Sequence, residues 1–175
     1  TAPIVLVASL AFAPNNLVEY IAYAKANPDK ILWGTAGSGA MNHLSGVLLH
    51  SEIKTGATFV HYKGGLSAIA PDLLTGRVHV HPTSLQNALP YIRSGKLKPL
   101  AMFNRNRMSQ LPDVRTAHEQ GVADFEQPNY FGFVTASGTS PAIVDKLSTE
   151  LAKVAKMPDI VKKMEDDGAI MVAST

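Results

Sequence analysis

The sequence contains no cysteine, no hydrophobic run long enough to cross a bilayer, and no large excess of one charge. Without cysteine, disulfides, thiolate chemistry and cysteine-ligated zinc are excluded. Sixteen basic against fourteen acidic residues leave a formal charge of +2, which does not favour nucleic acid as a partner. The apolar run over residues 4–13 is shorter than the roughly 20 residues of a membrane span. We interpret it as a buried strand rather than a signal peptide.

Apolar strand patterns alternate with helical patterns along most of the 175 residues. Such alternation predicts an α/β fold with a mainly parallel sheet and helices on both faces. The predicted strands are Pro3 to Leu10, Ile31 to Thr35, Thr58 to Tyr62, Arg77 to His81, Leu97 to Phe103 and Tyr130 to Ala136. The predicted helices cover about residues 17–27, 40–54, 66–74 and 85–93. Two more are predicted to begin at Pro141, with an apolar stripe as far as Val154, and at Pro158, ending at Asp167.

Several local signals mark where these helices begin and bend. Either Asn15 or Asn16 can cap the first helix, and the stretch from Thr116 to Glu119 has the pattern of a capping box. Pro71 and Pro90 fall inside helical patterns and are predicted to shorten or kink those helices.

A glycine-rich turn between the second strand and the next helix is the first candidate site. Gly37, Ser38 and Gly39 lie there, where free N–H groups and the helix dipole favour an anion. The Ser38 hydroxyl could cap the helix or face a ligand. His43, one turn into the helix, could donate to the same anion. A tight turn without a ligand would have the same sequence.

Two further strand ends repeat this arrangement. Lys63 and Gly64 follow the third strand, and Thr83 and Ser84 follow the fourth. Because parallel strands end at the same edge of a sheet, we expect all three turns to meet at one ligand position. Neutral or cationic turns without an acid there predict a carboxylate or phosphate ligand, although Lys63 could equally be a solvated side chain.

Enzyme motifs do not fit the glycine turn. Asn42 stands where a dinucleotide fingerprint needs its third glycine, and no P-loop lysine is present. Two alternatives remain open: Ser38 as a hydrolytic nucleophile, and a metal site of His79 and His81 with His61 from a strand predicted to be adjacent. No carboxylate is spaced to complete that site, so we predict no metal and no cofactor.

Five motifs together resemble the Bug-type substrate-binding receptors of tripartite tricarboxylate transporters, and the resemblance spans nearly the whole chain. The motifs are residues 19–28, Gly37-Ser38-Gly39 with His43, Tyr62-Lys63-Gly64, residues 88–92 with 95–97, and residues 111–114 with 119–121.

This resemblance implies a periplasmic, two-lobed binding protein of type II fold that is not an enzyme. Such a receptor captures a small organic mono- or dicarboxylate and passes it to membrane permease subunits. The family holds the carboxylate mainly through backbone N–H groups and water at turns of both lobes. The ligand contacts carried over to this sequence are Gly37, Ser38, Gly39, His43, Lys63 and Gly64.

The resemblance also implies a division of the chain. Residues 11–129 would form one lobe, while residues 1–10 and 130–175 would supply two crossing hinge strands and the C-terminal part of the other lobe. We expect the rest of that other lobe to precede residue 1. Four residues depart from the usual family pattern and are expected near the cleft: His61, His79, Pro82 and Thr83.

Overall fold

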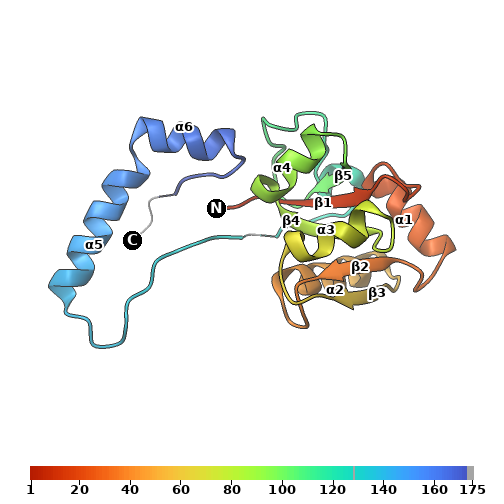
Figure 1. The fold of residues 1–175 in the computed structure, drawn as a ribbon, viewed down its shortest axis with the longest axis horizontal. Coiled ribbons are helices and arrows are strands. Elements are labelled where there is room, and N and C mark those ends of the chain that lie inside the picture. The colour runs from red at the N-terminus through yellow and green to blue at the C-terminus, as the bar shows by residue number, and fades with distance from the viewer. Residues whose placement is uncertain (128, 173–175) are drawn as a thin grey trace.

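The computed structural model describes residues 1–127 and 129–172, and five of its strands form one sheet in the order β3-β2-β4-β1-β5 (Figure 1). The strands are β1 (Ile4–Ser9), β2 (Leu32–Thr35), β3 (Thr58–His61), β4 (Val80–Ser84) and β5 (Leu97–Met102). The helices are α1 (Leu17–Ala26), α2 (Met41–Ile53), α3 (Leu66–Leu74), α4 (Leu85–Arg93), the short 3₁₀ helix η1 (His118–Gln120), α5 (Pro141–Ala155) and α6 (Pro158–Asp166).

The sheet is mixed, with one strand running against the other four. β2 is parallel to β3 and β4, whereas β1 is antiparallel to both of its neighbours, β4 and β5. The predicted mainly parallel α/β sheet is therefore confirmed. The direction of β1 was not predicted, because its partners come much later in the chain than the helix that follows it.

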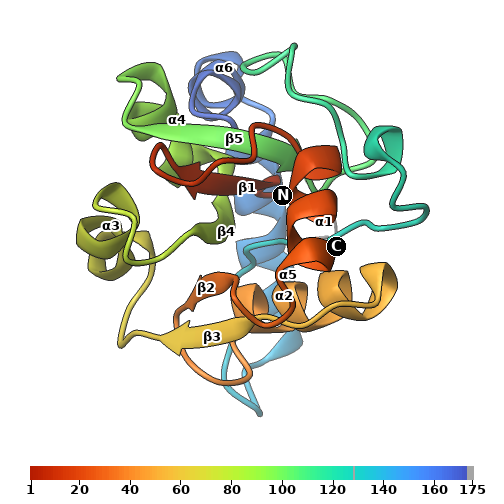
Figure 2. The same cartoon turned by 90° about the vertical axis from the view of Figure 1, so that its right-hand side faces the viewer.

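Helices cover both faces of the sheet, as predicted, and each face has its own hydrophobic core (Figure 2). The core under α1 and α2 includes Tyr20 and Trp33, and the core under α3 and α4 includes Ile69 and Leu73. The residues of β1 from Ile4 to Ala8 alternate between the two cores, and all six residues of the strand are buried. This agrees with the prediction of a strand that is covered on both faces.

The predicted capping signals are confirmed. Asn16 Oδ1 accepts from Glu19 N at 2.9 Å and caps α1. In the capping box, Thr116 N donates to Glu119 Oε2 at 2.7 Å, and Glu119 N donates to Thr116 Oγ1 at 3.2 Å. α3 and α4 continue through Pro71 and Pro90 and end three residues later.

The fourth strand lies further along the chain than predicted. Residues 77–79 do not belong to β4, because the chain is still turning there: Val78 N donates to Asp72 O, and Arg77 forms an ion pair with Asp72. The strand begins only at Val80, which places Thr83 and Ser84 at its carboxyl end.

The prediction of a strand over residues 130–136 is wrong. These residues are not in a strand, and their side chains are exposed, by 78% at Tyr130 and 95% at Val134. Within the described residues no strand lies beside them to form a ladder; the nearby backbone link joins Ala2 N to Asn129 O at 2.9 Å. A β-rich composition without a pairing partner does not make a strand.

Beyond this segment, α5 and α6 extend away from the sheet (Figure 1). They begin at Pro141 and Pro158 as predicted, and α6 ends one residue earlier than expected. Neither helix has a buried residue, and the apolar stripe of α5 is exposed at Ile143, Leu147 and Val154. None of the helices in the described part of the chain is long and apolar enough to cross a membrane.

Gly46 of α2 lies close to side chains of β2 and β3. A Cβ at this position would lie 2.5 Å from Cε1 of Phe59 and 2.7 Å from Cε2 of Trp33. We expect Gly46→Ala to lower the free energy of unfolding by about 1–2 kcal/mol, because overpacking outweighs the gain of about 1 kcal/mol in helix propensity. Urea denaturation would measure this loss.

Gly132→Ala is the matched control, since nothing lies within 4 Å of its added Cβ. Equal stability of the two variants would contradict the tight contact at Gly46.

Candidate functional site

An open hollow of about 190 Å³ lies where β4 ends and α2, α3 and α4 begin. The three predicted strand ends meet at this edge because β2, β3 and β4 run parallel. The lining residues are Ile4, Met41, Asn42, Ser45, Gly65, Leu66, His81, Pro82, Thr83, Ser84, Asn87, Gln127, Asn129 and Phe131. The hollow is therefore bounded by the beginnings of three helices, by β4 and by Gln127, Asn129 and Phe131.

None of these three helix N-termini has a side-chain cap. The N-cap residues of α2 and α3 are Ala40 and Gly65, which have no side-chain acceptor, and the Ser84 hydroxyl at α4 makes no capping bond. By contrast, α1 begins elsewhere and is capped by Asn16. The beginnings of three helices without a side-chain cap thus border one hollow, an environment that favours a bound anion.

Two of the predicted site residues line the hollow. Thr83 is 7% exposed there, and Ser84 lies beside it at the start of α4. The other six, which are Gly37, Ser38, Gly39, His43, Lys63 and Gly64, are not among the lining residues. Their role in ligand binding stays a prediction. Their immediate neighbours in the chain, Met41, Asn42 and Gly65, do line it.

Side chains occupy the N–H groups of the glycine turn. Ala36 N donates to Asn42 Oδ1 at 2.9 Å, and Gly39 N donates to His43 Nδ1 at 3.2 Å. Gly37 N donates to Thr35 Oγ1 at 3.3 Å. Positive φ values of 134° at Gly37 and 77° at Gly39 explain why glycine is needed. Ser38 does not cap α2, so that alternative for its hydroxyl is wrong.

The histidines do not form the cluster that a metal site needs. The sequence predicted that the strands of His61 and His81 are adjacent. This prediction is wrong, because β2 lies between β3 and β4. His61 Nδ1 instead lies 2.5 Å from Thr35 Oγ1, and its ring packs edge-on against His43. No group of three His, Asp or Glu residues in the described ranges could hold a metal ion.

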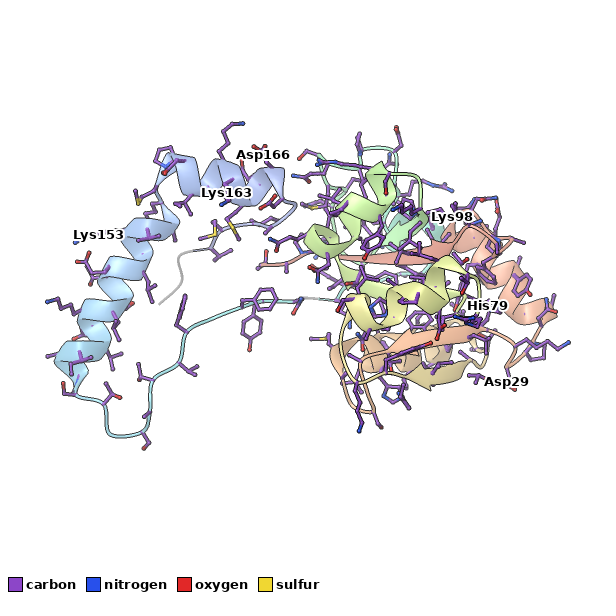
Figure 3. All side chains as sticks on the ribbon, viewed as in Figure 1. Asp29, His79, Lys98, Lys153, Lys163 and Asp166 are labelled. Atoms are coloured by element: carbon purple, nitrogen blue, oxygen red, sulfur yellow. The ribbon has the colours of Figure 1, made fainter. Side chains whose placement is uncertain are left out.

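His79 lies away from the hollow, contrary to the expectation from the family pattern. It precedes β4 and stacks on Phe12 with a ring centroid distance of 4.8 Å. Figure 3 shows His79 at the end of the molecule far from α5 and α6. Burial lowers its pKa. Of the four residues that depart from the usual family pattern, Pro82 and Thr83 line the hollow, while His61 and His79 do not.

His81 is the buried titratable side chain among the lining residues of the hollow in the described part of the chain. Its Nδ1 lies 2.9 Å from the carbonyl oxygen of Gly34, and only 1% of the residue is exposed. Burial lowers its pKa to about 4, although the Gly34 carbonyl opposes that shift. The ring is therefore neutral at neutral pH.

Six polar lining residues were not predicted as ligand contacts from sequence: Asn42, Ser45, His81, Asn87, Gln127 and Asn129. Asn87 follows Ser84 by one helical turn, a spacing that could have indicated it. Gln127 comes from a loop and reaches α2, where its Oε1 accepts from Ser45 Oγ at 2.6 Å. No local sequence signal marks such a long-range contact.

Solved structures with the same fold define the class of protein. The chain superimposes with a TM-score of 0.91 on Rpa4515 of Rhodopseudomonas palustris with adipate, at 28% identity over 97% of this chain and 56% of that one. It matches MatC of the same organism with bound malate at a TM-score of 0.83 and 28% identity, over 97% and 57%. The fold is that of periplasmic binding proteins.

The family model described as "Tripartite tricarboxylate transporter family receptor" matches residues 1–174, and this chain belongs to that family. Protein BugT of Bordetella pertussis is 30% identical over 99% of this chain and 53% of its own length. The resemblance inferred from sequence motifs is thereby confirmed. The chain spans about half the length of the curated relatives it matches.

Proposed function

We propose that this chain is a ligand-binding part of a periplasmic receptor that captures a small organic mono- or dicarboxylate for a tripartite tricarboxylate-type transporter. The observation that carries the proposal is the meeting of three uncapped helix N-termini, those of α2, α3 and α4, at one hollow. A carboxylate placed there would receive the backbone hydrogen bonds that no side chain supplies.

The charge of the lining supports an anionic ligand. No acidic side chain is among the lining residues of the hollow in the described part of the chain. Asn42 and Asn87 come from first turns of α2 and α4, and Thr83 and Ser84 add hydroxyl groups. A carboxylate would therefore meet neutral dipoles and no opposing charge.

The relatives and their names support the same ligand class. Rpa4515 and MatC were solved with adipate and malate, which are both small dicarboxylates. By extension, the receptor would pass its ligand to the membrane permease subunits of the transporter. Binding and hand-over are its whole activity in this proposal, without a cofactor or a chemical step.

We further propose the division into lobes that the sequence suggests. Residues 11–129 form one lobe, with β1 inserted into its sheet, and α5 and α6 belong to the other lobe. Two backbone contacts join the segments that pass between them: Ala2 N donates to Asn129 O, and Ile170 N donates to Thr1 O, each at 2.9 Å. Closure would hinge at these segments.

Thermal unfolding of the full-length protein tests the function. Adipate, malate, succinate and citrate are each added at rising concentration. A ligand at 100 times its Kd is expected to add about 2.7 kcal/mol of apparent stability and to raise the melting temperature. If no carboxylate raises it, the proposed function is wrong.

The variant Thr83→Asp tests whether the hollow is the binding site, because it places a carboxylate inside the hollow. We expect it to abolish the ligand-induced shift through charge repulsion. Thr149→Asp introduces the same change on the exposed surface of α5 and should leave the shift intact. An enzyme acting through Ser38 would instead hydrolyse simple esters and lose that activity in Ser38→Ala.

A further inference from the structure

His81 gives the hollow a hydrogen-bond acceptor as well as its donors. The residue is the second of β4, pairs with Val7 of β1, and is almost fully buried. Because a carbonyl oxygen can only accept, the contact at 2.9 Å to Gly34 O requires that Nδ1 carries the proton. A neutral ring with its proton on Nδ1 leaves a lone pair on Nε2.

Nε2 has no hydrogen-bond partner within residues 1–127 and 129–172. His81 is one of the residues that line the hollow, so a ligand held there lies beside this side chain. Once a ligand displaces water from the hollow, this acceptor is satisfied only by a donor on the ligand.

A carboxylate oxygen cannot supply that hydrogen bond, because it carries no proton. The helix N-termini of α2, α3 and α4 offer donors, so they suit the carboxylate, and His81 suits a different group on the same molecule. Building on the proposed function, we propose that the ligand is a carboxylate bearing a hydroxyl or ammonium group that donates to Nε2 of His81.

The test compares ligands that differ by one group. The affinity of the full-length protein for three dicarboxylates is measured by calorimetric titration. Malate carries a hydroxyl group, aspartate carries an ammonium group, and succinate carries neither. We expect malate or aspartate to bind about tenfold more tightly than succinate, which is the effect of one hydrogen bond of about 1.4 kcal/mol. Equal affinity for all three would overturn the inference while leaving the carboxylate receptor in place.

Variants of His81 assign the preference to this side chain. His81→Leu removes the acceptor and should make the affinities for malate, aspartate and succinate equal. His81→Gln retains an acceptor oxygen and should restore part of the preference. A preference that persists unchanged in His81→Leu would contradict the assignment. Binding of no carboxylate at all would instead refute the proposed function, so the two failures are distinguishable.

A measurement on the unaltered protein covers the case in which both variants unfold. The ¹⁵N resonance of Nε2 in the wild-type protein should move when malate or aspartate is added, whichever binds more tightly, and should move less with succinate. The same resonance in the free protein should show the tautomer with its proton on Nδ1. A proton on Nε2 in the free protein would overturn the inference.

Discussion

Trp33→Ala is expected to lower the free energy of unfolding by about 3–5 kcal/mol, the range for removing a large aromatic side chain from a core. Trp33 is fully buried in β2, and its ring packs edge-on against those of Tyr20, His50 and Phe59. Its indole N–H donates to the carbonyl oxygen of Asn42 at 2.9 Å. The variant therefore loses both the packing under α2 and a hydrogen bond to its first turn.

Urea denaturation followed by circular dichroism measures this effect. Trp33→Phe is the control: it keeps an aromatic ring but loses the bond to Asn42, so we expect a loss of about 1–2 kcal/mol. Because Asn42 lines the hollow, Trp33→Ala should also weaken carboxylate binding. A loss below about 1 kcal/mol in Trp33→Ala would show that α2 does not depend on this side chain.

Acidification from pH 7.5 to pH 5 is expected to cost about 4 kcal/mol of stability, through two buried histidines. Burial lowers the pKa of His50 to about 4, and it does the same for His81. The unfolded chain has the ordinary histidine pKa near 6.5, so below that pH it binds protons that the folded chain does not. Stability is thus full above pH 7 and falls as the pH drops from about 6.5 towards 4. Each histidine contributes about 2 kcal/mol at pH 5.

The fluorescence of Trp33 reports unfolding at each pH, since it is the one tryptophan of the sequence. His50→Gln should remove about half of the dependence, although it also disturbs the contacts of His50 with Tyr20 Oη and Thr55 Oγ1, both at 2.8 Å. The lost contacts lower the free energy of unfolding at every pH, whereas the lost titration changes its slope against pH. Comparing the slopes of the two proteins therefore isolates the titration of His50. A wild-type stability that does not change between pH 7.5 and 5 would contradict the prediction.

Features set by neighbouring residues could be predicted from the sequence. The Asn16 cap, the Thr116 to Glu119 capping box and the bounds of α3 and α4 all depend on a few consecutive side chains. That β2, β3 and β4 end at the same edge of the sheet followed from the alternation of strands and helices, because it requires only that these strands be parallel.

Features that depend on distant residues were missed. The 130–136 segment has the composition of a strand, but nothing in its sequence tells whether a partner strand lies beside it. Gln127 reaches the hollow because its loop returns to α2. His81 could be noticed in the sequence, yet its role depends on the carbonyl of Gly34, on a strand 47 residues earlier.

The position of β1 between β4 and β5 bears on how the chain acquires its structure. Ile4 pairs with Ser84 and Val5 with Met102, so β1 cannot be enclosed until the residues up to Met102 have been synthesised. Contacts of such sequence separation slow folding, because a long loop must close before they form. Until then an apolar strand of six residues stays exposed, which favours aggregation. Chaperones, or fast synthesis of the segment between β1 and β5, would protect β1 during this interval.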